Sequence, residues 1–184
     1  MGPTELRTNR LLLRPFRFED VDDVLAYAAD EIWSRYLVAF QSQAYSRADA
    51  ERFVARTVLE PWGTHPCFAI EAAGRVIGGI NLRVDTERKV AALGYGIALP
   101  YWGRGLTVEA ARAVIDWAFL SFDIVKVYAT THVDNRQSIR VLEKLGMQRE
   151  GVLRRHRYFR GEHVDEVWYG LLREENRPRP DATA

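Results

Sequence analysis

Hydrophobic and polar residues alternate along the chain in short blocks that predict a mixture of strands and helices. Apolar runs of strand length, several of them bounded by glycine or proline, recur along most of the sequence. The strands are expected at residues 10–16, 67–72, 76–84, 90–98, 126–132, 152–159 and 163–172. Apolar positions at helical spacing predict helices at residues 18–29, 47–59, 108–119 and 135–145. This order of elements is typical of an α/β (α+β) domain whose front half is antiparallel.

Four acidic residues mark the start of the first predicted helix: Glu19, Asp20, Asp22 and Asp23. The strand before it contains Pro15, which favours an edge strand ending in a turn. Negative charge stabilises the positive end of a helix, although an acidic cluster can also bind a cation. We favour a solvated helix start, because all four acids are expected to point away from the apolar face.

The connection at residues 31–45 is rich in aromatic residues but shows no clear period, so we expect loop and short helical turns. Its rings are Trp33, Tyr36, Phe40 and Tyr45. Trp33 and Tyr36 are candidates for substrate binding in an acceptor pocket. Ordinary packing under a loop explains such rings at least as often.

Composition and charge restrict the class of protein. Hydrophobic residues make up 47% and charged residues 28% of the 184 residues, as in one globular domain. We expect that domain at residues 1–174 and a flexible tail at residues 175–184, which hold two prolines and few apolar groups. A formal net charge of +1 provides no overall field to attract nucleic acid or an anionic membrane, so neither is an expected partner.

Cys67 is the only cysteine, so no internal disulfide can form and a structural zinc site is not expected. The sequence shows neither a signal-peptide pattern nor an apolar run of about 18 residues that would span a membrane. We therefore expect a cytoplasmic protein without a metal.

A glycine-containing turn between a predicted strand and a predicted helix is a candidate phosphate site. Gly103, Arg104 and Gly105 follow the strand at residues 90–98 and precede the helix at residues 108–119. Such a turn leaves backbone N–H groups pointing in one direction, and the helix dipole and Arg104 add positive charge. Glycines also serve simple turns, so this feature alone leaves both interpretations open. The P-loop and Rossmann patterns do not match here.

Two other features flank this turn. Gly94 and Gly96 interrupt the strand at residues 90–98, which indicates a bulge or close approach by another group. Asn135 and Ser138 stand three residues apart where a strand gives way to a helix. They either cap that helix or face a neighbouring cleft.

Two motifs together resemble the GCN5-related N-acetyltransferase (GNAT) family. Residues 101–110, YWGRGLTVEA, resemble the family's acetyl-CoA loop, and residues 135–147, which begin NRQS and end EKLGM, resemble its second motif. The likeness is narrower to the RimJ/RimL type, which acetylates N-terminal α-amino groups of ribosomal proteins, and extends over residues 10–173. It implies the GNAT fold, a mixed, mostly antiparallel twisted sheet of about six to seven strands flanked by about four helices.

The resemblance implies transfer of an acetyl group from acetyl-CoA to a primary amine. An N-terminal α-amino group of a protein is the expected acceptor. A small amine, such as a polyamine, an aminoglycoside or an amino-acid-like compound, is the alternative, because a fold does not fix the acceptor. A non-catalytic acyl-CoA-binding module is a third hypothesis, and exposed strand edges leave a homodimer open.

Roles for individual residues also follow from the resemblance. Acetyl-CoA is expected in a V-shaped gap between the fourth and fifth predicted strands. Ser138 is the implied catalytic residue, which serves the departing thiolate because Leu142 stands where many members have tyrosine. The implied cofactor-binding residues are Tyr95, Gly96, Ile97, Gly103, Arg104, Gly105, Leu106, Thr107, Val108 and Asn135.

The sequence departs from the family pattern at further positions. Thr107 stands where alanine or glycine is usual, so it is expected to crowd the pyrophosphate loop. Arg157 stands where RimL-like members can carry a glutamate base. Its neighbour His156 could relay a proton but is more often a surface side chain, so the general base stays open. At pH 7 an α-amine of pKa about 7.8 is roughly one-seventh neutral, far more than a lysine amine near about 10.4. The missing glutamate therefore favours an α-amine or another amine of low pKa.

Overall fold

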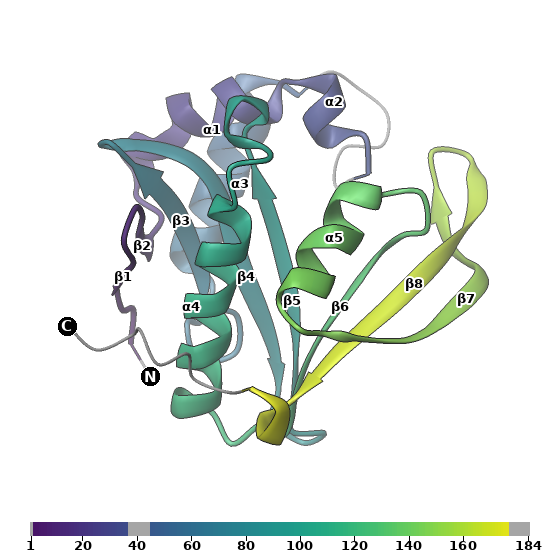
Figure 1. The fold of residues 1–184 in the computed structure, drawn as a ribbon. Helices are drawn as coiled ribbons and strands as arrows, with labels where there is room; N and C mark the ends of the chain where they lie inside the picture. Colours follow the sequence, from purple (N-terminus) through teal and green to yellow (C-terminus); the bar gives the residue numbers. More distant parts are fainter. Residues whose placement is uncertain (1, 37–44, 177–184) are drawn as a thin grey trace.

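The structure is a computed structural model that describes residues 2–36 and 45–176. These residues form one open sheet of eight strands in the order β1-β2-β3-β4-β5-β6-β8-β7, with helices on both faces (Figure 1). All neighbouring strands are antiparallel except β5 and β6. The predicted mixed, mostly antiparallel α/β fold is confirmed. Phe40 and most of the predicted tail lie outside the described residues.

The strands follow the predicted apolar runs, with ends that differ by a few residues. They are β1 Leu6–Arg7, β2 Leu12–Pro15, β3 Cys67–Ala72, β4 Arg75–Asp85, β5 Val90–Ile97, β6 Lys126–His132, β7 Gln148–Phe159 and β8 Glu162–Leu172. β1 was not predicted, because a two-residue strand is too short to show alternation. Since β2 pairs with both β1 and β3, the prediction that it is an edge strand is wrong.

The described residues form five α-helices and three short 3₁₀ turns. The α-helices are α1 Val21–Ala28, α2 Glu31–Ser34, α3 Arg47–Leu59, α4 Leu106–Ser121 and α5 Arg136–Lys144. The 3₁₀ turns are η1 Phe18–Asp20, η3 Leu99–Tyr101 and η4 Arg173–Glu175. The single turn α2 confirms the short helical turn expected in the aromatic connection, and it adds one helix to the expected number.

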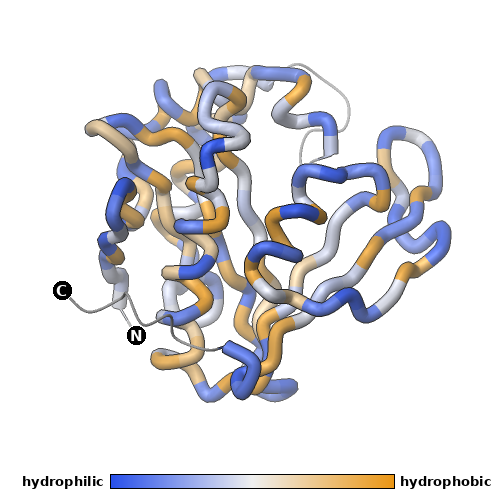
Figure 2. Tube along the Cα trace, viewed as in Figure 1, coloured by the Kyte–Doolittle hydropathy of each residue, from blue (hydrophilic) through white to orange (hydrophobic). Residues whose placement is uncertain are grey.

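Two apolar cores lie on opposite faces of the sheet. α4 packs Ala110, Ala111, Val114 and Ile115 into the larger core, all with no exposed surface. α1 and α3 cover the other face, where Cys67 lies in the smaller core. Burial raises the pKa of the Cys67 thiol to about 12, which confirms its interpretation as a core residue. Hydrophobic segments concentrate in the strands and α4, whereas the hairpin turn of β7 and β8 is largely hydrophilic (Figure 2).

The acidic start of the first helical segment is not uniformly solvated. Asp20 is buried and accepts two hydrogen bonds of 2.8 Å from the Arg14 guanidinium. Asp23 accepts hydrogen bonds from Arg75 and from the backbone N–H of Val76. The prediction that all four acids point to solvent is wrong, because these partners come from strands that the helical pattern does not show.

The sheet opens between β5 and β6. Their parallel pairing extends over three residue pairs and ends at Ala92 and Tyr128, after which the two strands diverge (Figure 1). β5 remains paired with β4 as far as Ile97, and β6 with β8 as far as His132. The predicted V-shaped gap is therefore confirmed, and it divides the sheet into two halves.

Candidate active site

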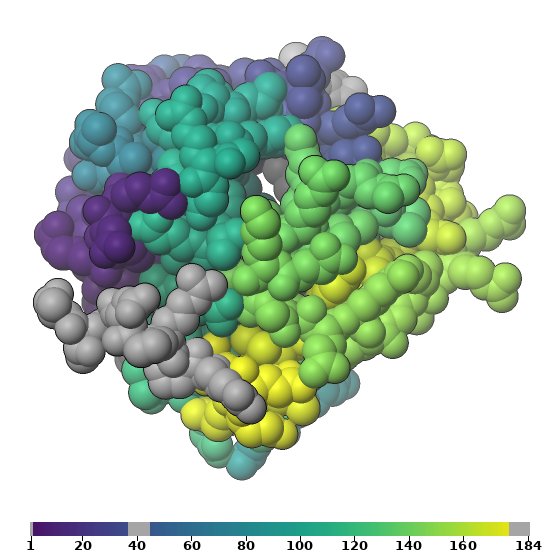
Figure 3. All heavy atoms as spheres, viewed as in Figure 1, coloured from purple at the N-terminus to yellow at the C-terminus, as the bar shows by residue number. Residues whose placement is uncertain are grey.

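A pocket of about 720 Å³ occupies the opening between β5 and β6. Its walls come from the free end of β5, the first turns of α4 and α5, and the turn after α2. Figure 3 shows the surface hollowed between the α4 and α5 segments. Most of the residues singled out from the sequence line this one pocket: Trp33, Tyr36, Tyr95, Gly96, Ile97, Gly103, Gly105, Thr107, Val108, Asn135 and Ser138.

The start of α4 presents a row of unsatisfied backbone donors. Gly105 is the N-cap residue in the left-handed conformation (φ +77°), and no side chain caps the helix. Gly103 also has positive φ (+72°) and open space around it. No described residue accepts a hydrogen bond from the backbone N–H groups of residues 103–108. Such a row at a helix N-terminus is suited to phosphate oxygens, so the local geometry fits the pyrophosphate of acetyl-CoA.

Two residues of the predicted loop do not line the pocket with their side chains. Leu106 is buried in the larger core. The Arg104 guanidinium lies over the Tyr101 ring, 5.6 Å from its centroid. Any contact of these two residues with a phosphate would therefore come from their backbone N–H groups.

A charged cluster ties the loop to the N-terminal segment. Arg10 donates from Nη1 to the Arg104 carbonyl oxygen at 3.0 Å and from Nε to Glu109 at 2.7 Å. Thr8 also donates to Glu109, at 2.6 Å. These bonds hold the glycine turn and the first turn of α4 in one arrangement.

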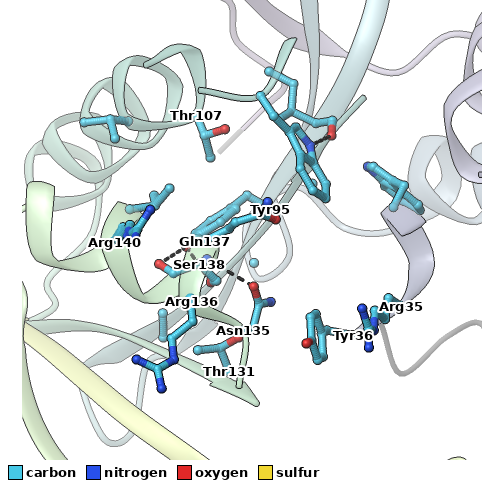
Figure 4. Close-up of a pocket in the computed structure, with 18 of the residues that line it drawn as sticks. Arg35, Tyr36, Tyr95, Thr107, Thr131, Asn135, Arg136, Gln137, Ser138 and Arg140 are labelled. Atoms are coloured by element: carbon cyan, nitrogen blue, oxygen red, sulfur yellow. Dashed lines mark hydrogen bonds between the residues drawn. The ribbon is translucent and has the colours of Figure 1, made fainter. Parts of the chain in front are cut away.

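Ser138 and Tyr95 form a hydrogen-bonded pair at the centre of the pocket (Figure 4). Their hydroxyl oxygens are 2.9 Å apart. Asn135 caps α5 by accepting a 3.1 Å hydrogen bond from the Ser138 backbone N–H, so the cap that the sequence suggested lies inside the cleft. Burial raises the pKa of Tyr95, which keeps its phenol protonated. Leu142 is fully buried in the core.

The free end of β5 is closely packed on one side. A Cβ atom on Gly96 would lie 2.8 Å from the Trp33 ring, so only glycine fits there without a shift. The Ile97 carbonyl oxygen accepts a 2.6 Å hydrogen bond from Trp102 Nε1. These contacts fix the strand edge along which Tyr95, Gly96 and Ile97 line the pocket.

The end of the pocket opposite Thr107 carries Tyr36 and Arg35 (Figure 4). The Tyr36 hydroxyl donates to the Asp134 carbonyl oxygen at 3.5 Å, and its ring lies 5.2 Å from the His132 ring. The Arg35 guanidinium lies over the Tyr36 ring, 5.6 Å from its centroid. Tyr36 therefore bridges α2 and β6 across the opening.

The ion pair between Arg157 and Glu166 is the main feature that the sequence interpretation missed. Arg157 lines the pocket and donates to Thr130 Oγ1 at 3.1 Å. Its other partner is the carboxylate of Glu166, whose side chain is only 4% exposed. On β8 the side chains of Val164, Glu166 and Trp168 share one face of the strand. An acidic residue between apolar residues of the same face signals a buried partner, and that signal was present in the sequence. His156 is half exposed and does not line the pocket.

Comparisons with known proteins agree with this geometry. Residues 10–148 match the family described as the acetyltransferase (GNAT) domain. The chain belongs to the GNAT acetyltransferases. It is 30% identical over 173 residues to the uncharacterised N-acetyltransferase p20 of Bacillus licheniformis, a match that covers 92% of this chain and 97% of that relative. This GNAT protein is therefore an acetyl-CoA-dependent N-acetyltransferase, and the hypothesis of a non-catalytic module is set aside.

Solved structures confirm the GNAT fold. A GNAT-family acetyltransferase from Bacillus anthracis has a TM-score of 0.82 and 26% identity, with 94% of this chain and all (100%) of that chain covered. RimL, the ribosomal L7/L12 α-N-protein acetyltransferase solved with coenzyme A, has a TM-score of 0.84. It is 18% identical, with 94% of this chain and 99% of that chain covered, so this likeness shows the fold alone.

Two kinds of feature are absent from the described residues. No group of three or more His, Cys, Asp or Glu side chains is placed to hold a metal ion. No helix in the described part is long and apolar enough to span a membrane.

Proposed function

We propose that this GNAT enzyme acetylates the N-terminal α-amino group of a protein. The observation that supports its cofactor site is the row of unaccepted N–H groups at residues 103–108, which opens into the same pocket as Ser138. In this arrangement the pyrophosphate lies on the first turn of α4, and the pantetheine arm follows the free edge of β5 and Asn135. When bound, acetyl-CoA supplies the activated acetyl group.

Ser138 is the proposed catalytic residue. Its hydroxyl lies at the first turn of α5, where the positive end of the helix favours a developing negative charge. It donates a hydrogen bond to the departing sulfur, and the Tyr95 hydroxyl, 2.9 Å behind it, supports that donor. A main-chain N–H on the free edge of β5 polarises the acetyl carbonyl, an interaction worth about 3 kcal/mol when well aligned.

The lining of the pocket supports an acceptor that is easily deprotonated. Asp134 is the only carboxylate among the described lining residues, and its side chain is 71% exposed. No buried carboxylate of that lining is available as a strong base. An α-amine, which is partly neutral at pH 7, can lose its proton through water. A small amine of similar pKa remains the alternative.

The first test is an acceptor panel. Purified enzyme with acetyl-CoA is incubated with short peptides that have free N-termini, with the same peptides blocked at the N-terminus but carrying lysine, and with small amines. CoA release is measured together with the mass of each product. We expect free N-termini to be acetylated and blocked lysine peptides to react at least tenfold more slowly. Much faster turnover of a small amine than of any peptide would reverse this assignment.

The cofactor site is tested with Gly105→Ala. A Cβ atom at this positive-φ position strains the backbone of the loop, so we expect CoA affinity to fall at least tenfold by calorimetry. Gly74→Ala is the matched control, because Gly74 has the same φ of +77° in a hairpin turn away from the pocket. Equal affinity in the two variants would contradict the proposed pyrophosphate site.

A further inference from the structure

The lining of the pocket is strongly cationic. Away from it, Arg14, Arg47 and Arg75 each pair with a carboxylate. Five cationic side chains line the pocket, and within the described residues only one of them, Arg157, forms an ion pair. The five are Arg35, Arg136, Arg140, Lys144 and Arg157. Asp134 is the one described acid in this lining, so the pocket is suited to bind more than one anionic group.

Three of these cations lie on α5. Arg136, Arg140 and Lys144 are spaced four residues apart on α5, so they share one face of that helix. Arg140 lies on the Thr107 side of the pocket, next to the start of α4 (Figure 4). Arg136 lies beside Thr131, away from Thr107 (Figure 4), so Arg140 is the cation of this stripe that is placed for the phosphate charges of coenzyme A. Arg35 and Arg157 remain without a role.

Arg35 and Arg157 are both linked to the same face of β6. Arg157 donates to Thr130, and Arg35 lies over the ring of Tyr36, which packs on His132. Thr130 and His132 are two residues apart on β6, so their side chains project from one face of the sheet. This places the two arginines at the acceptor end of the pocket rather than at the phosphate end.

Arg157 is held in a fixed orientation. Its Nη2 atom donates to Thr130 Oγ1 and pairs with Glu166, whose buried carboxylate anchors the guanidinium. Its Nε and Nη1 atoms have no hydrogen-bond partner among the described residues, and its side chain is 30% exposed in the pocket. A planar guanidinium that is fixed through one nitrogen and has its other N–H groups unpaired is preorganised to donate hydrogen bonds to a carboxylate.

We propose that the acceptor carries a carboxylate close to its reactive amine, and that Arg157 and Arg35 bind this group. The inference rests on the proposed acetyl transfer to an N-terminal amine and names its substrate class, a peptide with Asp or Glu among its first residues. The cations disfavour a polyamine, which has no anionic group and would meet like charge.

The test uses three matched peptides with the same free N-terminal alanine and with Asp, Asn or Lys as the second residue. Free alanine and alanine amide form a second arm, which distinguishes a peptide acceptor from an amino-acid-like one. We expect kcat/KM to be at least tenfold higher for the Asp peptide than for the Asn peptide, and lowest for the Lys peptide. Added salt should reduce this preference, since exposed charges are screened.

Substitutions of Arg35 and Arg157 test whether these two arginines cause the preference for the Asp peptide. Arg35→Gln should reduce the Asp-over-Asn ratio several-fold, because the Asn side chain carries no charge for Arg35 to bind. Arg157→Gln alone would leave the Glu166 carboxylate buried without its partner. The double variant Arg157→Gln with Glu166→Gln is therefore used, because it removes both charges of the ion pair together. Arg154→Gln, an exposed position on β7 outside the pocket lining, is the control and should keep the ratio.

The outcomes separate the inference from the function on which it rests. Equal rates for the Asp and Asn peptides, or a ratio unchanged in both arginine variants, would overturn the inference and leave the N-terminal acetyltransferase intact. Acetylation of alanine but of no peptide would overturn the peptide class and support the carboxylate requirement. Acetylation of no amine in either arm would overturn both.

Discussion

Ser138 and Tyr95 meet at the centre of the pocket although they are 43 residues apart in the chain. Ser138 lies at the start of α5, and the Tyr95 hydroxyl contacts both its side chain and its carbonyl oxygen. Leu142, where many GNAT proteins have tyrosine, is buried in the core and offers no donor. In the proposed mechanism, proton donation to the thiolate therefore depends on this pair.

Removal of the Ser138 hydroxyl should affect the chemical step more than binding. We expect Ser138→Ala to lower kcat by about 10- to 100-fold, in the range typical of lost acid catalysis, with CoA affinity changed less than about twofold. Tyr95→Phe should give a smaller loss, because it removes only the support of the donor. Steady-state kinetics and calorimetry on both variants check this. A Ser138→Ala enzyme with normal kcat would exclude the serine from the reaction.

The pH dependence of kcat/KM should reflect the ionisation of the acceptor amine and not that of Tyr95. Because burial raises the pKa of Tyr95, the phenol stays protonated over the working range. The reactive amine is the deprotonated form, so kcat/KM should rise with pH through about 7.8 and then stay level to about pH 9.5. A fall in activity between pH 8 and 9.5 that disappears in Tyr95→Phe would contradict this expectation.

Among the larger elements, the buried group around Arg14 joins β2 to the first helical segment. Arg14 donates to Asp20 and to Glu71 of β3, and the hydrogen bond to Asp20 raises the pKa of Arg14. Both side chains of the Arg14–Asp20 ion pair are buried, with exposed fractions of 6% for Arg14 and 7% for Asp20. It therefore fixes how the helical layer begins on its face of the sheet.

Loss of this arginine should be strongly destabilising. Arg14→Ala leaves Asp20 buried without its partner, and we expect the free energy of unfolding to fall by about 3–5 kcal/mol in urea denaturation. Arg47→Ala serves as the control, since Arg47 pairs with Asp22 on the surface. The control should unfold almost like the parent protein. A similar decrease in the free energy of unfolding in both variants would mean that burial of the ion pair is not the cause of the destabilisation.

At the scale of the whole molecule, the cofactor cleft exists because the sheet separates into two halves. β5 and β6 are joined through three residue pairs only, and α4 and α5 stand on either side of the opening (Figure 1). A ligand that lies between them contacts both halves at once. Its binding should therefore stabilise the entire domain in proportion to its saturation.

Hydrogen exchange should locate this effect. With saturating CoA, backbone amides of residues 103–108 should exchange at least tenfold more slowly, because they gain phosphate acceptors that the protein itself does not provide. Amides at the turn between β7 and β8 should exchange as before, since this hairpin end lies outside the pocket lining. Uniform slowing over the chain, or none at the α4 start, would argue against the cleft as the binding site.

Local patterns along the chain are enough to predict most of the elements and the glycine turn before α4. Apolar periodicity is a local property, so it predicted most strands and helices, and Gly103 and Gly105 marked the turn before α4 because few residue types accept positive φ. The cap formed by Asn135 and the burial of Cys67 also follow from local pattern.

Which polar groups meet depends on how the elements are arranged in space. Tyr95 with Ser138, Arg157 with Glu166, and Arg14 with Asp20 come from different elements, and their contacts depend on strand order and register. The opening between β5 and β6 likewise results from the point at which their pairing ends. Local sequence carries no record of such distances, because side-chain contacts between elements are set by packing in three dimensions.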